Sequence, residues 1–107
     1  MPTPVTYNRK VDKSQILYFN LKVREGNDFL DISTWSFKFT LTAKNGGVTW
    51  TILNADFTRP DVYTVSFEKS IVQVGEVADG NYTISLLFTN SQMTDNEYMT
   101  GTWEFKS

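Results

Sequence analysis

The chain has 107 residues and a formal net charge of -2, which fits one domain and argues against a broad nucleic-acid-binding surface. It contains no cysteine and no histidine, so disulfides, thiolate nucleophiles and the commonest general base are all excluded. No apolar run approaches the roughly 20 residues that cross a bilayer, and the N-terminus shows no signal-peptide pattern. We therefore expect neither nucleic acid nor membrane as a partner.

The residue types favour β-structure. Val, Ile and Thr are abundant, aromatic residues make up 15%, and Ala is scarce. A weak alternation covers residues 5–10, and the strongest one covers residues 35–44, where apolar and polar side chains alternate with a strict period of two. Further alternating runs, each predicting a strand, cover residues 17–23, 48–52, 63–67, 82–88 and 99–105.

Turn residues separate these runs. Asn45-Gly46-Gly47 predicts a tight hairpin, and residues 54–60 predict a longer loop that ends at Pro60. The stretch 70–77 fits either a short strand or a packed crossover. Six or seven short strands in one chain predict an all-β fold, a single antiparallel β-sandwich over residues 1–107, with a small β-barrel as the alternative.

The N-terminal segment is expected to differ from the rest of the domain. Pro2 and Pro4 resist incorporation into a central strand, so Met1 to Thr6 predict a short arm. At its longest, this extended arm covers residues 1–8.

The strand phase also sorts the aromatic residues. Those on the inward phase, expected in the core, are Trp35, Phe37, Phe39, Trp50, Trp103 and Phe105. Tyr18, Leu87 and Tyr98 fall on the outward phase and are the candidate interface residues.

No arrangement of residues predicts catalysis. The close acidic pairs, which are Asp28 with Asp31, Asp56 with Asp61, and Asp95 with Glu97, lie in or beside turns, where Asp caps backbone N–H groups. Calcium requires six to eight oxygen ligands, and the best loop offers two carboxylates, Asp56 and Asp61. The neighbours Lys13-Ser14 and Lys69-Ser70 are no evidence for a Ser–Lys dyad. We therefore expect no enzyme, no catalytic residue, no metal and no cofactor.

The order of motifs resembles a small immunoglobulin-like domain of tailed-phage virion proteins, nearest to the N-terminal domain of upper baseplate proteins. The resemblance rests on segments spread over the chain: residues 15–32, residues 35–47, the strand at 62–67, Asp79-Gly80-Asn81-Tyr82-Thr83-Ile84, and Gly101-Thr102-Trp103-Glu104-Phe105. It implies an immunoglobulin-like β-sandwich. Such domains often continue into a larger protein, whereas this sequence stops at the last strand, so we expect a stand-alone component.

The function implied by the resemblance is non-enzymatic. It is that of a structural or adaptor protein of the virion: a capsid decoration protein, a head-fibre or neck component, or a tail or baseplate component. The implied partners are other virion proteins and further copies of the chain, with assembly into the virion after synthesis in the host cytoplasm. The arm at residues 1–8 would then add a strand to a neighbour.

Two other classes of function compete with this interpretation. A carbohydrate-binding or adhesin-type β-sandwich requires two or more coplanar exposed aromatic rings. A hydrolase requires an activated nucleophile or a placed pair of carboxylates, and the residue pattern disfavours it.

Overall fold

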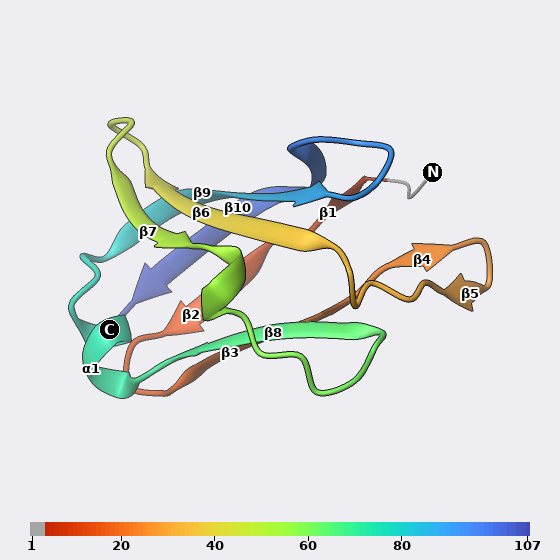
Figure 1. Cartoon of the computed structure of the whole chain (residues 1–107). Helices are drawn as coiled ribbons and strands as arrows, with labels where there is room; N and C mark the ends of the chain where they lie inside the picture. The colour runs from red at the N-terminus through yellow and green to blue at the C-terminus, as the bar shows by residue number, and fades with distance from the viewer. Residues whose placement is uncertain (1–3) are drawn as a thin grey trace.

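The computed structural model describes residues 4–107 and stacks their strands in two layers (Figure 1). The larger layer is a six-stranded sheet with the order β1-β10-β9-β6-β7, in which β2 also pairs with β10. Its strands are β1 (Val5–Thr6), β2 (Arg9–Asp12), β6 (Ser36–Ala43), β7 (Val48–Ile52), β9 (Gly80–Thr89) and β10 (Asn96–Lys106). The opposite layer pairs β3 (Leu17–Lys22) with β8 (Thr64–Lys69).

The remaining elements connect these layers. A short hairpin of β4 (Arg24–Glu25) and β5 (Asp28–Phe29) projects at the end of the molecule opposite α1 (Ile71–Gly75) (Figure 1). The turn η1 (Asn54–Asp56) follows β7. Arg59 anchors the loop after η1, since its guanidinium donates to the carbonyl oxygens of Ile32 (2.7 Å) and Trp35.

This architecture confirms the predicted β-sandwich, and within residues 4–107 no strand pair closes the two sheets into a barrel. The sandwich is immunoglobulin-like. The Tyr82 hydroxyl donates to the carbonyl oxygen of Ala78 (2.7 Å), which forms the tyrosine corner typical of such sandwiches. Gly80 at φ 145° starts the strand that carries Tyr82, and other residue types rarely adopt this backbone conformation.

One detail of the predicted topology is different. β1 and β2 run parallel to β10, whereas the other strand pairs are antiparallel. The first and last strands are far apart in sequence, so no hairpin constrains their direction. Residues 1–3 of the expected arm lie outside the described residues, and β1 lies along β10 of the same chain.

The core lies between the two layers. Trp103, on the larger sheet, is fully buried and contacts Phe19 of the smaller sheet and Phe39 of its own, with ring centroids 6.1 and 5.3 Å away. Phe37 and Phe105 are also buried, as predicted. Trp35 and Trp50 are only partly buried and pack against the rim of the core.

Residues 70–77 form a packed crossover from β8 to β9, one of the two alternatives from the sequence, and this crossover contains a helix that the sequence did not predict. Ser70 begins it with a capping box: its side chain accepts a hydrogen bond from the Gln73 backbone N–H (3.2 Å), and its own N–H donates to the Gln73 side chain (3.0 Å). Val74 faces the core from this helix and is fully buried.

Candidate functional site

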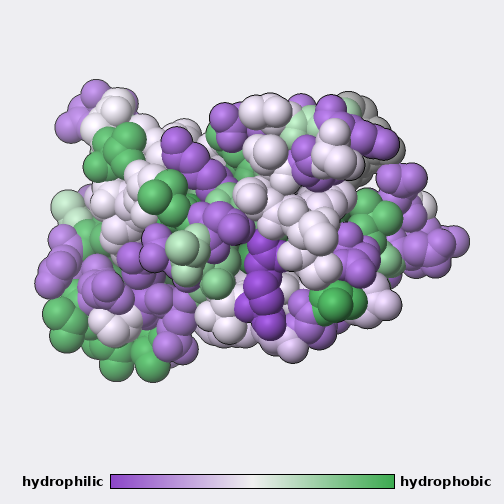
Figure 2. Space-filling model, viewed as in Figure 1, coloured by the Kyte–Doolittle hydropathy of each residue, from purple (hydrophilic) through white to green (hydrophobic). Residues whose placement is uncertain are grey.

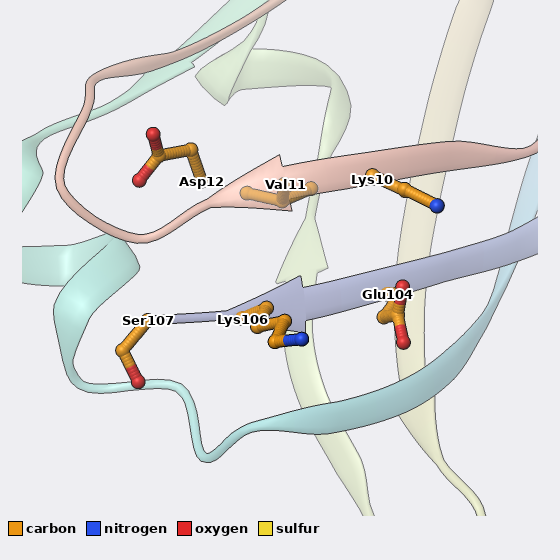
Figure 3. Close-up of a pocket in the computed structure, with 6 residues that line it drawn as sticks. All are labelled: Lys10, Val11, Asp12, Glu104, Lys106 and Ser107. Carbon is orange, nitrogen blue, oxygen red and sulfur yellow. The ribbon is translucent and has the colours of Figure 1, made fainter.

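A hollow in the surface lies along β2 and β10 (Figure 3). It has a volume of about 350 Å³ and is shallow and open to solvent. The strand register places Lys10 beside Glu104 and Asp12 beside Lys106, so charges of opposite sign alternate along it. Residues 4–107 contain no cluster of three or more acidic side chains that could hold a metal ion.

Three acidic side chains of the pairs named from the sequence, Asp31, Asp56 and Asp61, accept hydrogen bonds from nearby backbone N–H groups. Asp31 accepts hydrogen bonds from the Ser33 hydroxyl (2.6 Å) and the Ser33 N–H (3.0 Å), which lower the pKa of Asp31. Asp61 accepts from the Tyr63 N–H (2.8 Å), and hydrogen bonds from Thr64 and Tyr63 lower its pKa. Asp56 accepts from the Leu53 N–H (3.3 Å), so each carboxylate of the loop considered for calcium serves its local backbone.

Lys13 and Ser14 are directed to different partners. The Lys13 ammonium lies 2.8 Å from Asp79, while the Ser14 hydroxyl donates to Asp12 (2.6 Å). Asp79 also accepts from the Ser107 hydroxyl, and these hydrogen bonds, that from Lys13 being the largest cause, lower the pKa of Asp79 to about 2. The Lys13–Asp79 ion pair and the Ser107–Asp79 hydrogen bond together connect the loop after β2 to the C-terminal residue.

The three candidate interface residues have different environments. Tyr18 is 51% exposed on β3. Leu87 is half-buried on β9, between Lys38 and Glu97 of the neighbouring strands. The expected exposure of Tyr98 is wrong, since its side chain is only 4% exposed and packs against Phe88. A bulge between Glu97 and Met99 reverses the phase of β10, so Tyr98 and Met99 both face inward.

Exposed aromatic rings do not form a platform. Phe29 lies under two cations, with Lys22 and Arg24 5.1 and 4.8 Å from its ring centroid. Each aromatic pair found among residues 4–107 includes at least one buried ring. Stacking of a sugar ring across two exposed aromatics, as the carbohydrate-binding alternative requires, therefore has no support in this part of the chain.

A cluster of exposed aliphatic side chains lies where α1 begins. Ile71 and Val72 are 51% and 69% exposed on the first turn of the helix. Ile16, 53% exposed, precedes the pair of Leu17 with Lys69 and so lies beside the start of the helix. We call Ile16, Ile71 and Val72 the α1 patch. Figure 2 shows hydrophobic side chains gathered at the lower left of the molecule, where Figure 1 places α1.

Sequence reasoning did not identify the α1 patch. The available signal was the apolar run of Ile71, Val72 and Val74 in a crossover of only a few residues. A single helical turn can bury only one side, so Val74 enters the core and the other two remain outside.

The comparisons with known proteins identify no family for this chain. Neither a scan against protein-family models nor a search of curated proteins finds a match for the chain. Among solved structures, the chain is similar to extracellular domains 3–5 of Drosophila OTK, with 13% sequence identity and a TM-score of 0.34. The match covers 97% of this chain and 32% of that structure, so the chain spans about a third of its length. A likeness of this size says nothing about function.

None of the helices among residues 4–107 is long and apolar enough to cross a membrane.

Proposed function

We propose that the chain is a structural or adaptor protein of a tailed-phage virion that acts through protein–protein docking. The α1 patch is the observation that supports docking. Three branched aliphatic side chains, each at least half exposed, lie together at one end of the domain. Contiguous exposed apolar surface of this kind marks contact sites.

The chemistry of the patch supports a protein partner. Ile and Val side chains offer no hydrogen bonds, so they gain free energy from burial against another apolar surface, at roughly 25 cal/mol per Å². A sugar would instead be recognised by polar groups and exposed rings, and the α1 patch has neither. The virion setting comes from the resemblance of the strand and turn motifs, which also implies homo-oligomeric assembly.

The proposal is tested by association with particles. Purified recombinant protein is mixed with virions produced by the cells that encode the chain, and the mixture is separated on a density gradient. We expect the protein to migrate with the particles. The variant Ile71→Asp/Val72→Asp should lose this association, because it places two charges in the contact.

The matched control is Val48→Asp. Val48 is 61% exposed, on β7, so it carries a comparable change away from the α1 patch and should leave the association intact. Failure of the unmodified protein to migrate with particles overturns the virion proposal. If the protein instead binds immobilised glycans, the carbohydrate-binding alternative replaces it.

A further inference from the structure

The outer edge of β3 is open. β3 pairs with β8 on one side, and no strand of residues 4–107 pairs with it on the other. The N-terminal strands, which precede β3 in the chain, pair with β10 instead. The smaller sheet therefore ends in a strand whose backbone groups can accept another strand.

Three hydrogen bonds show which backbone groups of β3 point away from β8. The carbonyl oxygen of Tyr18 accepts from the Arg9 guanidinium (3.1 Å), so it points away from β8. Ser66, opposite Asn20, exchanges both of its backbone hydrogen bonds with Thr58 (2.7 and 2.9 Å), so the pair of Asn20 with Ser66 is not hydrogen-bonded. Because these directions alternate along a strand, Tyr18, Asn20 and Lys22 all direct their N–H and C=O groups outward.

The other sheet edges are less suited to pairing. β7 has an irregular register, with a shift between Leu41 and Thr42 of its neighbour β6. β2 is four residues long and carries the charged side chains of Arg9, Lys10 and Asp12. By contrast, β3 pairs with β8 over six consecutive residues without a shift, and its only charged side chain is Lys22 at its end.

We propose that β3 pairs with β3 of a second copy, antiparallel and centred on Asn20. The two smaller sheets would then form one continuous four-stranded sheet across the dimer. In this register Asn20 lies opposite Asn20 of the partner subunit, and the Tyr18 ring lies opposite Lys22 of the partner subunit. The same pair of Tyr18 with lysine repeats across the two-fold axis. This pairing places a cation against an aromatic ring and no like charges opposite each other.

Exposure on the outer face permits this contact. Tyr18, Asn20 and Lys22 are all exposed, while the alternate residues Leu17, Phe19 and Leu21 are buried in the core. Pairing therefore leaves the core packing of each copy unchanged. It requires the Arg9 guanidinium to leave the Tyr18 carbonyl and the Lys22 ammonium to exchange the Phe29 ring for the Tyr18 ring of the partner subunit. The proposal rests on the homo-oligomeric docking protein proposed above and names its self-contact, but the test uses purified protein without particles.

The native mass of the purified protein tests whether the chain forms this dimer. Sedimentation velocity from micromolar to near-millimolar protein should give a dimer in equilibrium with the 12.3 kDa monomer. Tyr18→Lys places lysine opposite the partner's Lys22 in both symmetric pairs and should weaken the dimer about tenfold or more. Adding Lys22→Glu to that variant makes the pairs opposite in charge again and should restore the dimer. Both positions are exposed, so the variants fold.

Two further variants separate backbone pairing from side-chain effects. Asn20→Pro removes an outward N–H without removing a hydrogen bond to β8, and should abolish the dimer. Lys38→Glu changes the charge of an exposed residue on β6 and should leave it unchanged. The proposal is overturned if the unmodified protein stays monomeric at every concentration. It is also overturned if neither Tyr18→Lys nor Asn20→Pro weakens the dimer. Neither result affects association of the α1 patch with particles, so the two proposals fail separately.

Discussion

The two sheets of this sandwich are stabilised in different ways. In the six-stranded sheet, β9 is paired along both edges, with β10 and with β6. In the smaller sheet, β3 has one partner, and β8 has β3 and a single bridge to Thr58. The smaller sheet therefore depends more on side-chain burial against the larger sheet than on its own hydrogen-bond ladder.

Burial on β8 is consistent with this difference. Its consecutive residues Thr64, Val65, Ser66 and Phe67 are all buried, so the outer side of the strand is covered as well as the inner side. Thr58 supplies the cover and the backbone hydrogen bonds for Ser66. A small sheet can thus complete one edge with a loop while leaving the other available for contact.

The largest effect is expected where the sheets meet. Trp103→Ala should lower the free energy of unfolding by about 3–5 kcal/mol, because it removes a fully buried ring that contacts aromatics of both sheets. Urea denaturation measures this loss. Val48→Ala, at a 61% exposed position of β7, should change stability by less than about 0.5 kcal/mol. A comparable loss in the two variants would contradict a core that joins the sheets through Trp103.

A smaller loss of stability is expected where the segment after β1 lies closest to β10. A methyl group on Gly101 would overlap the carbonyl oxygen of Tyr7, so Gly101→Ala should displace β1 and cost about 1–3 kcal/mol. Hydrogen exchange of the Tyr7 amide, which donates to the Thr100 carbonyl (2.8 Å), should accelerate. Gly75→Ala is the control, since a methyl group there meets no atom within 4 Å. Unchanged exchange at Tyr7 in Gly101→Ala would show that β1 does not need this close approach.

The smallest effect concerns the ion pair at the C-terminal end of the larger sheet. The pKa of Asp79 is lowered from 3.8 to about 2, so the carboxylate stabilises the fold above its unfolded pKa. That contribution should disappear as the pH falls from about 4 to about 2. Chemical denaturation at several pH values should show a shallower acid loss in Asp79→Asn than in the unmodified protein. Asp28→Asn controls for the loss of one negative charge, and equal slopes in the two variants would argue against the Lys13–Asp79 contact.

Much of the fold could be predicted from the alternation of side chains. The run at 48–52 coincides with β7, and the strongest run at 35–44 contains β6. On β7 this alternation is present, although only Ile52 is buried. The run at 35–44 was readable because one face of β6 is buried and the other faces solvent, which imposes a period of two. Tyr98 was misplaced for the same reason: a single bulged residue reverses the phase, and nothing local in the sequence marks the position of that bulge.

The candidate contact surfaces were harder to predict from the sequence than the strands. Tyr18 was identified because an isolated outward aromatic is visible in the strand pattern. The α1 patch was not, because Ile16 and Val72 are far apart in the chain and only the pairing of β3 with β8 brings their segments together.

The sequence by itself determined that this chain forms an all-β sandwich with an aromatic core, because residue type and alternation act locally along each strand. The tertiary structure alone decided that the first strands join β10 rather than β3. Parallel pairing between distant segments depends on the close approach of Tyr7 to Gly101 and on packing across the whole sandwich. That choice leaves the edge of β3 open, and with it the surface on which we expect a second copy to pair.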